Sequence, residues 1–164
     1  MTALLLIAAI SALLCIAAWR DVATRLVPDS LSIAVAVLGL ALQIGALGAL
    51  PFGSIAAAAM VFVALLALCM CGVLGGADMK LAAALCLALP PAAVPGFIFV
   101  TTLAGGLMGV AYAARPRFTP TPGDSLVRRV LLAESRRLRR GGPLPYCIAI
   151  AVGGILSLVT VPGS

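Results

Sequence analysis

The acidic residues of this 164-residue chain are few enough to be considered one by one for chemistry. There are five of them, and the chain has no histidine: Asp21, Asp29, Asp78, Asp124 and Glu134. Without histidine, neither a Ser-His-Asp triad nor an imidazole metal site can be built. A pair of carboxylates remains possible, because one can act as general base on a water while the other donates its proton to a carbonyl oxygen.

The composition indicates where such a pair would work. Apolar residues make up 63% of the chain and charged residues 10%, against about 45–50% and about 25% in soluble domains. The mean hydropathy is +1.24 and the net charge is +6. These values exclude an ordinary soluble enzyme and a disordered chain, and they favour a polytopic membrane protein.

The apolar runs predict an all-α polytopic membrane protein with six transmembrane helices, organised as a single membrane-embedded domain over residues 1–164. A helix needs about 20 apolar residues to cross the hydrocarbon core. The expected spans are 2–19, 31–50, 54–74, 79–89, 93–114 and 144–161. The first is expected to be a retained span rather than a signal peptide, because it lacks a basic n-region. The fourth is short, and its length alone suggests a half-helix or a buried helix.

The basic residues predict the orientation. Arg20 and Arg25 lie in the first loop, Lys80 lies at the third, and the fifth loop holds eight arginines, whereas the second and fourth loops and both tails have none. The positive-inside rule therefore places the odd-numbered loops in the cytoplasm and both termini outside. Without a fourth crossing, the arginine-rich loop and Lys80 would lie on opposite sides, so the charge pattern favours six spans.

Two of the carboxylates are expected at the same membrane face. Asp21 closes the first span and Asp78 opens the fourth, both on the cytoplasmic side. Charged groups near membrane depth are costly, which makes each a functional hypothesis. Like charges at close range cannot both ionise, so two such acids would share a proton and titrate as a pair. A helix-capping role for Asp78 remains the alternative.

Other residue types have structural interpretations. Asp29 follows Pro28 and is expected to be the N-cap of the second span, with a third catalytic acid as the alternative. Lys80 is typical of a residue that extends toward the membrane interface. Five cysteines lie in or at the ends of the spans: 15, 69, 71, 86 and 147. Because their number is odd and no second Cys-x-Cys pair exists, they are interpreted as small packing residues rather than disulfides or metal ligands.

Three stretches of the chain together resemble the prepilin peptidase family, whose members are aspartic proteases with a GxGD motif continued as GxGDxKL. The first is Asp21, six residues, then Pro28-Asp29. The second is Gly75-Gly76-Ala77-Asp78-Met79-Lys80-Leu81. The third, Leu144-Pro145-Tyr146-Cys147-Ile148-Ala149-Ile150, is similar to the Pro-Tyr-x-x-Ala-Ile opening of the family's last span. The short chain resembles the small form found with tight-adherence (Flp-type) pili, and archaeal preflagellin peptidases are a related possibility.

The resemblance implies that Asp21 and Asp78 are the catalytic pair. The substrate would be a prepilin or pseudopilin, cut in the bacterial inner membrane, on the cytoplasmic side and just before its hydrophobic segment. The family's motif glycine is replaced by Ala77, which is tolerated unless the backbone there needs a positive φ. Supporting or substrate-binding roles are expected for Gly75, Gly76, Ala77, Lys80, Arg25 and Pro28.

The resemblance also bears on cofactors. Larger members of the family carry a cytoplasmic insert with two CxxC pairs and also N-methylate the new pilin terminus, and this chain has no such insert. We therefore expect peptidase activity with no metal or other cofactor and without methyltransferase activity.

The loop 115–142 is the one substantial polar segment. A helix is predicted from Asp124 to Arg140, with arginines between apolar residues. Such a helix is typical of an interfacial anchor on anionic lipids. A docking surface for the pilus assembly machinery is the alternative. No nucleic-acid partner is expected, because no aromatic residues are interleaved with the arginines.

A non-catalytic membrane protein is the rival hypothesis, either a small transporter or an assembly scaffold. An inactive peptidase relative belongs to the same class, because of Ala77. In a transporter, acidic groups are expected near the bilayer midplane. Asp21 and Asp78 are expected at one edge, which favours the protease.

Overall fold

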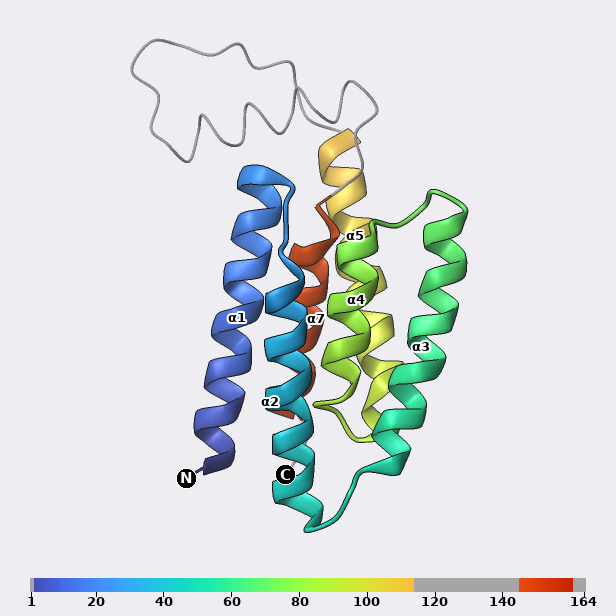
Figure 1. Cartoon of the computed structure of the whole chain (residues 1–164). Helices are drawn as coiled ribbons and strands as arrows, with labels where there is room; N and C mark the ends of the chain where they lie inside the picture. The colour runs from blue at the N-terminus through green and yellow to red at the C-terminus, as the bar shows by residue number, and fades with distance from the viewer. Residues whose placement is uncertain (1, 114–144, 161–164) are drawn as a thin grey trace, which may run out of the picture.

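A computed structural model describes residues 2–113 and 145–160 (Figure 1). Within these residues the chain forms six α-helices, one 3-10 turn and no strand. They are α1 (Thr2–Thr24), α2 (Asp29–Leu47), α3 (Phe52–Met70), α4 (Gly76–Cys86), η1 (Pro91–Ala93), α5 (Val94–Ala113) and α7 (Tyr146–Thr160). The loop 115–142 and its expected helix lie outside the described residues, so their predicted role stays a prediction.

Four of the helical segments are long and apolar enough to cross a membrane: Thr2–Thr24, Asp29–Leu47, Phe52–Met70 and Pro91–Ala111. The chain is therefore a multi-pass membrane protein. The first helix was expected to end at Trp19, but α1 continues to Thr24 and includes Asp21. The extra turn keeps the backbone amides near Asp21 hydrogen-bonded, and it places this carboxylate within the bundle.

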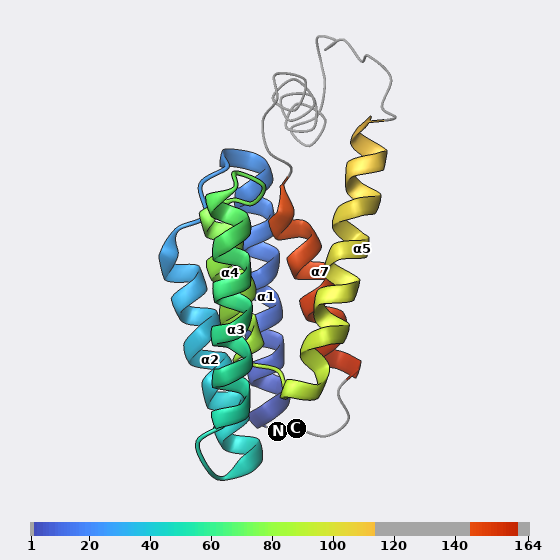
Figure 2. The same cartoon turned by 90° about the vertical axis from the view of Figure 1, so that its right-hand side faces the viewer.

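Helix α4 is short because protein, not lipid, surrounds it. Eight of its eleven residues are buried, and it packs against α2, α3 and α7. Eleven residues extend only about 16 Å, less than the ~30 Å of a hydrocarbon core. Residues 87–90 and η1 then carry the chain to the far end of the bundle, where α5 starts back (Figures 1 and 2).

Helix α7 lies between α1 and α5 and also contacts α4 (Figure 2). Small residues permit this position. At Gly154, an added Cβ would overlap the Leu85 side chain of α4 and lie 3.1 Å from Leu14 Cδ1 of α1. Close approach of helix backbones is the usual way in which membrane helices gain packing energy. As a result, the N-terminus of α7 lies at the same end of the bundle as the end of α1 and the start of α4.

A second close contact holds α2 against the end of α4. Buried Gln43 donates a hydrogen bond from Nε2 to the carbonyl oxygen of Ala88 over 3.0 Å. One turn earlier on α2, a Cβ added to Gly39 would lie 2.9 Å from both the Cβ and the backbone nitrogen of Ala88. Backbone atoms cannot move aside as a flexible side chain can, so this site requires glycine.

We expect Gly39→Ala to lower the free energy of unfolding by about 1–3 kcal/mol, the usual cost of overpacking a core. Gly45 is the matched control on the same helix, because a Cβ added there meets nothing within 4 Å. Gly45→Ala should leave stability unchanged or raise it, since alanine favours the helix. Thermal unfolding in detergent measures both variants, and an equal melting temperature for the two would contradict the predicted contact.

Candidate active site

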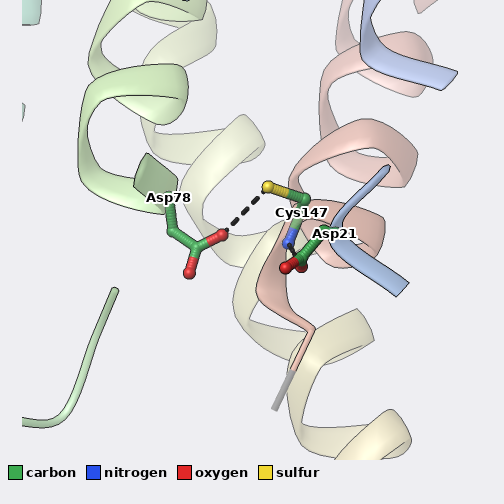
Figure 3. Close-up of side chains that lie close together, drawn as sticks. All are labelled: Asp21, Asp78 and Cys147. Atoms are coloured by element: carbon green, nitrogen blue, oxygen red, sulfur yellow. Dashed lines mark hydrogen bonds between the residues drawn. The ribbon is translucent and has the colours of Figure 1, made fainter. Parts of the chain in front are cut away.

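Three buried residues from three helices meet at one end of the bundle (Figure 3): Asp21 of α1, Asp78 of α4 and Cys147 of α7. One carboxylate oxygen from each aspartate and the Cys147 sulfur all lie within 4.8 Å of one another. We call this end of the bundle the aspartate end. The sequence predicted that Asp21 and Asp78 share a face, and the structure brings their carboxylates into one cluster.

Asp21 is held by the start of α7. Its side chain is in the last turns of α1 and the residue is 7% exposed. The backbone N–H of Cys147 donates a hydrogen bond to Asp21 Oδ2 over 3.3 Å. The first N–H groups of a helix have no partner within the helix, and the positive end of the helix dipole lies there. Helix α7 therefore offers Asp21 a donor suited to a carboxylate.

Asp78 is held by the first turn of α4. It is 8% exposed and is the third residue of the helix, so it is not the N-cap, which is Gly75. The carboxylate turns back over that glycine: a Cβ added to Gly75 would lie 2.8 Å from Asp78 Oδ2. A side chain at this helix position commonly reaches back to the N-cap residue. Glycine at position 75 thus leaves room for the carboxylate.

The two residues between Gly75 and Asp78 are under no such constraint. A Cβ added to Gly76 meets nothing within 4 Å. Ala77 lies in α4, and Arg25 is the one non-glycine residue with a positive φ in the described part of the chain. The replacement of the motif glycine by Ala77 therefore introduces no backbone strain in this conformation.

Cys147 contacts both aspartates, a role that its sequence pattern did not predict. Its thiol donates a hydrogen bond to Asp78 Oδ1 over 3.0 Å, in addition to the backbone N–H bound to Asp21. The residue is fully buried, so the interpretation as a packing residue describes its burial but not its polar contacts. The available signal was its place in the Pro145-Tyr146-Cys147 sequence, where a helix begins.

The other expected site residues lie around this cluster. Arg25 follows α1 with a φ of 59°, a left-handed conformation that is uncommon outside glycine and asparagine. It is near enough for its positive charge to act on Asp21 and Asp78. Its backbone N–H donates a hydrogen bond to the carbonyl oxygen of Asp21 over 3.0 Å, the bond that a left-handed residue commonly makes at the end of a helix.

Lys80 and Asp29 form an ion pair at the surface. The Lys80 Nζ is 2.8 Å from Asp29 Oδ2, and the two side chains are 45% and 62% exposed. The expectation that Asp29 is the N-cap of the second helix was wrong: Pro28 holds that position and Asp29 is the first helical residue. At that position the positive end of the helix dipole still stabilises the Asp29 carboxylate, which also pairs with Lys80.

The spacing of the cluster allows two kinds of chemistry. Among the residues described, Asp21, Asp78 and Cys147 form the one group whose oxygen and sulfur atoms are close enough to hold a metal ion, although the sequence predicts none. The same spacing suits a shared water. An O–H···O hydrogen bond spans about 2.7 Å, so two carboxylate oxygens within 4.8 Å can both bind one water molecule.

Comparison with known proteins identifies the family. The model of the type IV leader peptidase family matches residues 8–110, a stretch that includes both aspartates and the Gly75–Asp78 turn. Neither the curated proteins nor the solved structures gave a match. Because the matched stretch covers more than half of the chain, the protein belongs to the type IV leader peptidase family.

Proposed function

We propose that this protein is a membrane aspartic endopeptidase that removes the leader peptide of a prepilin or pseudopilin. The observation that carries the proposal is the convergence of two buried carboxylates, Asp21 and Asp78, within 4.8 Å at one end of a membrane bundle. Membership of the type IV leader peptidase family supports a protease that acts on prepilin-type substrates.

In the proposed reaction the two carboxylates share one proton and bind one water between them. The ionised carboxylate removes a proton from the water, whose oxygen attacks the carbonyl carbon of the scissile peptide bond. The protonated carboxyl donates its proton to the carbonyl oxygen. The tetrahedral intermediate then collapses as the C–N bond breaks. The carboxyl that took the water proton gives a proton to the leaving nitrogen, and the other carboxylate takes a proton from a hydroxyl of the intermediate. Neither a covalent enzyme intermediate nor a metal ion takes part.

The proposed site faces the cytoplasm. Arg20 and Arg25 lie in or just after the last turns of α1, and Lys80 lies near the start of α4. Both of these helix ends are at the aspartate end, and the positive-inside rule assigns an end with basic residues to the cytoplasmic side. Both chain ends are then extracytoplasmic, and the membrane is the bacterial inner membrane. This orientation gives the site access to a leader peptide that has not crossed the membrane.

We expect Asp21→Asn and Asp78→Asn each to lower the cleavage rate by about 10²–10⁴-fold, because each amide removes a group that transfers a proton. Asp29→Asn is the matched control, since Asp29 is exposed and pairs with Lys80, and it should keep the wild-type rate. Co-expression with a Flp-type prepilin, a gel shift and N-terminal sequencing of the product measure cleavage.

Two further results bear on this prediction. Immunoblots of the membrane fraction should show equal amounts of all four proteins, so that loss of cleavage is not loss of protein. Cleavage by purified enzyme should persist after treatment with EDTA, which distinguishes the proposed mechanism from a metal bound by the same three residues. Wild-type cleavage by either aspartate variant, or inactivation by EDTA that zinc restores, would refute the mechanism.

Gly75 provides a second prediction. Gly75→Ala should reduce kcat by about tenfold or more, because the added methyl group occupies the space of the Asp78 carboxylate and small misplacements of reacting groups cost large factors. Gly76→Ala, with open space around the same added group, is the control and should cleave at the wild-type rate. Equal rates for the two variants would show that the turn does not position Asp78.

The thiol of Cys147 provides a third prediction about cleavage. Cys147→Ser keeps a donor for Asp78 and should retain most of the activity, whereas Cys147→Ala removes the donor and should reduce kcat by roughly 10–100-fold, the equivalent of a lost hydrogen bond to a charged group. In both variants the backbone N–H to Asp21 is kept. If alanine and serine give the same rate, the thiol has no positioning role.

A further inference from the structure

A cavity lies beside Asp78. Its volume is about 520 Å³, within the range of sites that bind ligands. Helices α3, α4, α5 and α7 all contribute to its walls, and we call it the α3–α5 groove. Its lining includes Ala64 and Leu68 of α3, Asp78 and Ala82 of α4, Thr102 of α5 and Ile150 of α7.

The groove runs from the aspartate end toward the interior of the bundle. On α3 its lining extends from Leu68 back to Met60, eight residues or about 12 Å of helix. On α4 it includes Asp78 of the first turn and Ala82 of the next. Asp78 therefore lies at one end of the α3–α5 groove, which is about two helical turns long. The other residues that line the groove are mainly apolar.

The groove is open between two helices that face lipid. Ala64 and Leu68 of α3 and Ile98 and Thr102 of α5 are exposed, whereas Ala82 on its floor is buried. Helices α3 and α5 diverge toward the aspartate end (Figures 1 and 2). An apolar helix can therefore enter from the side without leaving the bilayer.

We infer that the α3–α5 groove binds the apolar segment that follows the scissile bond of the substrate, as a helix lying between α3 and α5. This inference rests on the proposed function. Asp78 is one of the residues that line the groove, so a helix bound there starts beside the residue that would act on the peptide bond. A lipid acyl chain would match the apolar walls, but it would bring no peptide bond to Asp78.

If the apolar helix of the substrate occupies the groove, the size of residue 64 affects which substrates fit. The small side chain of Ala64 leaves room on the exposed edge of the groove, so a larger residue would narrow the entrance. Helix-in-groove recognition places apolar side chains of one helix face into such a slot. Substrates with small residues in the first two turns of the apolar segment should fit best.

The experiment compares Ala64→Phe with Ala67→Phe, using the prepilin that the wild type cleaves. Both alanines are exposed on α3, and only Ala64 lines the groove. Ala64→Phe should raise KM by about tenfold or more, the effect of a steric change in an apolar pocket, whereas Ala67→Phe should match the wild type. Alanines in the first two turns of the substrate's apolar segment should restore cleavage by Ala64→Phe.

Photo-crosslinking gives a second measurement that does not depend on turnover. In the Asp78→Asn background, a photoreactive residue at Thr102 should form an adduct with the substrate's apolar segment, and one at Leu103, exposed but outside the groove, should not. Adducts with lipid alone, or unchanged KM in Ala64→Phe, would overturn the inference. Failure of the wild type to cleave any prepilin would instead refute the proposed function.

Discussion

The structure depends on keeping two buried carboxylates close together in a surrounding of low polarity. Two negative charges at such a distance repel strongly when water is scarce. Among the described residues, Cys147 supplies a hydrogen-bond donor to each carboxylate: its backbone N–H to Asp21 and its thiol to Asp78. The positive charge of Arg25 acts on both. The packing that positions α7 therefore also stabilises the pair of carboxylates.

The packing of the bundle follows from this requirement. Helix α7 lies between α1 and α5 and must also contact α4, and Gly154 allows its backbone to approach Leu14 of α1 and Leu85 of α4. Helix α4 must begin at the end of the bundle where α1 ends, and it packs against α2, α3 and α7, which is why it can be short and still contain many buried residues. The long helices α1, α2, α3 and α5 are apolar and mostly exposed, as membrane spans would be, and the two short ones contribute most of the interior.

Much of this arrangement could be predicted from the sequence. Apolar runs indicated the number and order of the described helices, and the distribution of basic residues predicted that Asp21 and Asp78 share one membrane face. The exact end of α1 could not be predicted, because a helix can continue past charged residues when the fold supplies partners. Asp29 was misassigned as a cap because its partner, Lys80, is 51 residues away. The role of Cys147 was missed because it depends on contacts across 126 and 69 residues.

The order of the helices along the chain has a consequence for biogenesis. A ribosome makes α1 through α5 first, and α7 follows only after residues 114–144. Until α7 inserts between α1 and α5, Asp21 lacks the amide and Asp78 lacks the thiol that it provides. A nascent chain that has inserted its first five helices would thus carry both acids without their final geometry, and assembly of the cluster of Asp21, Asp78 and Cys147 would be one of the last events of folding.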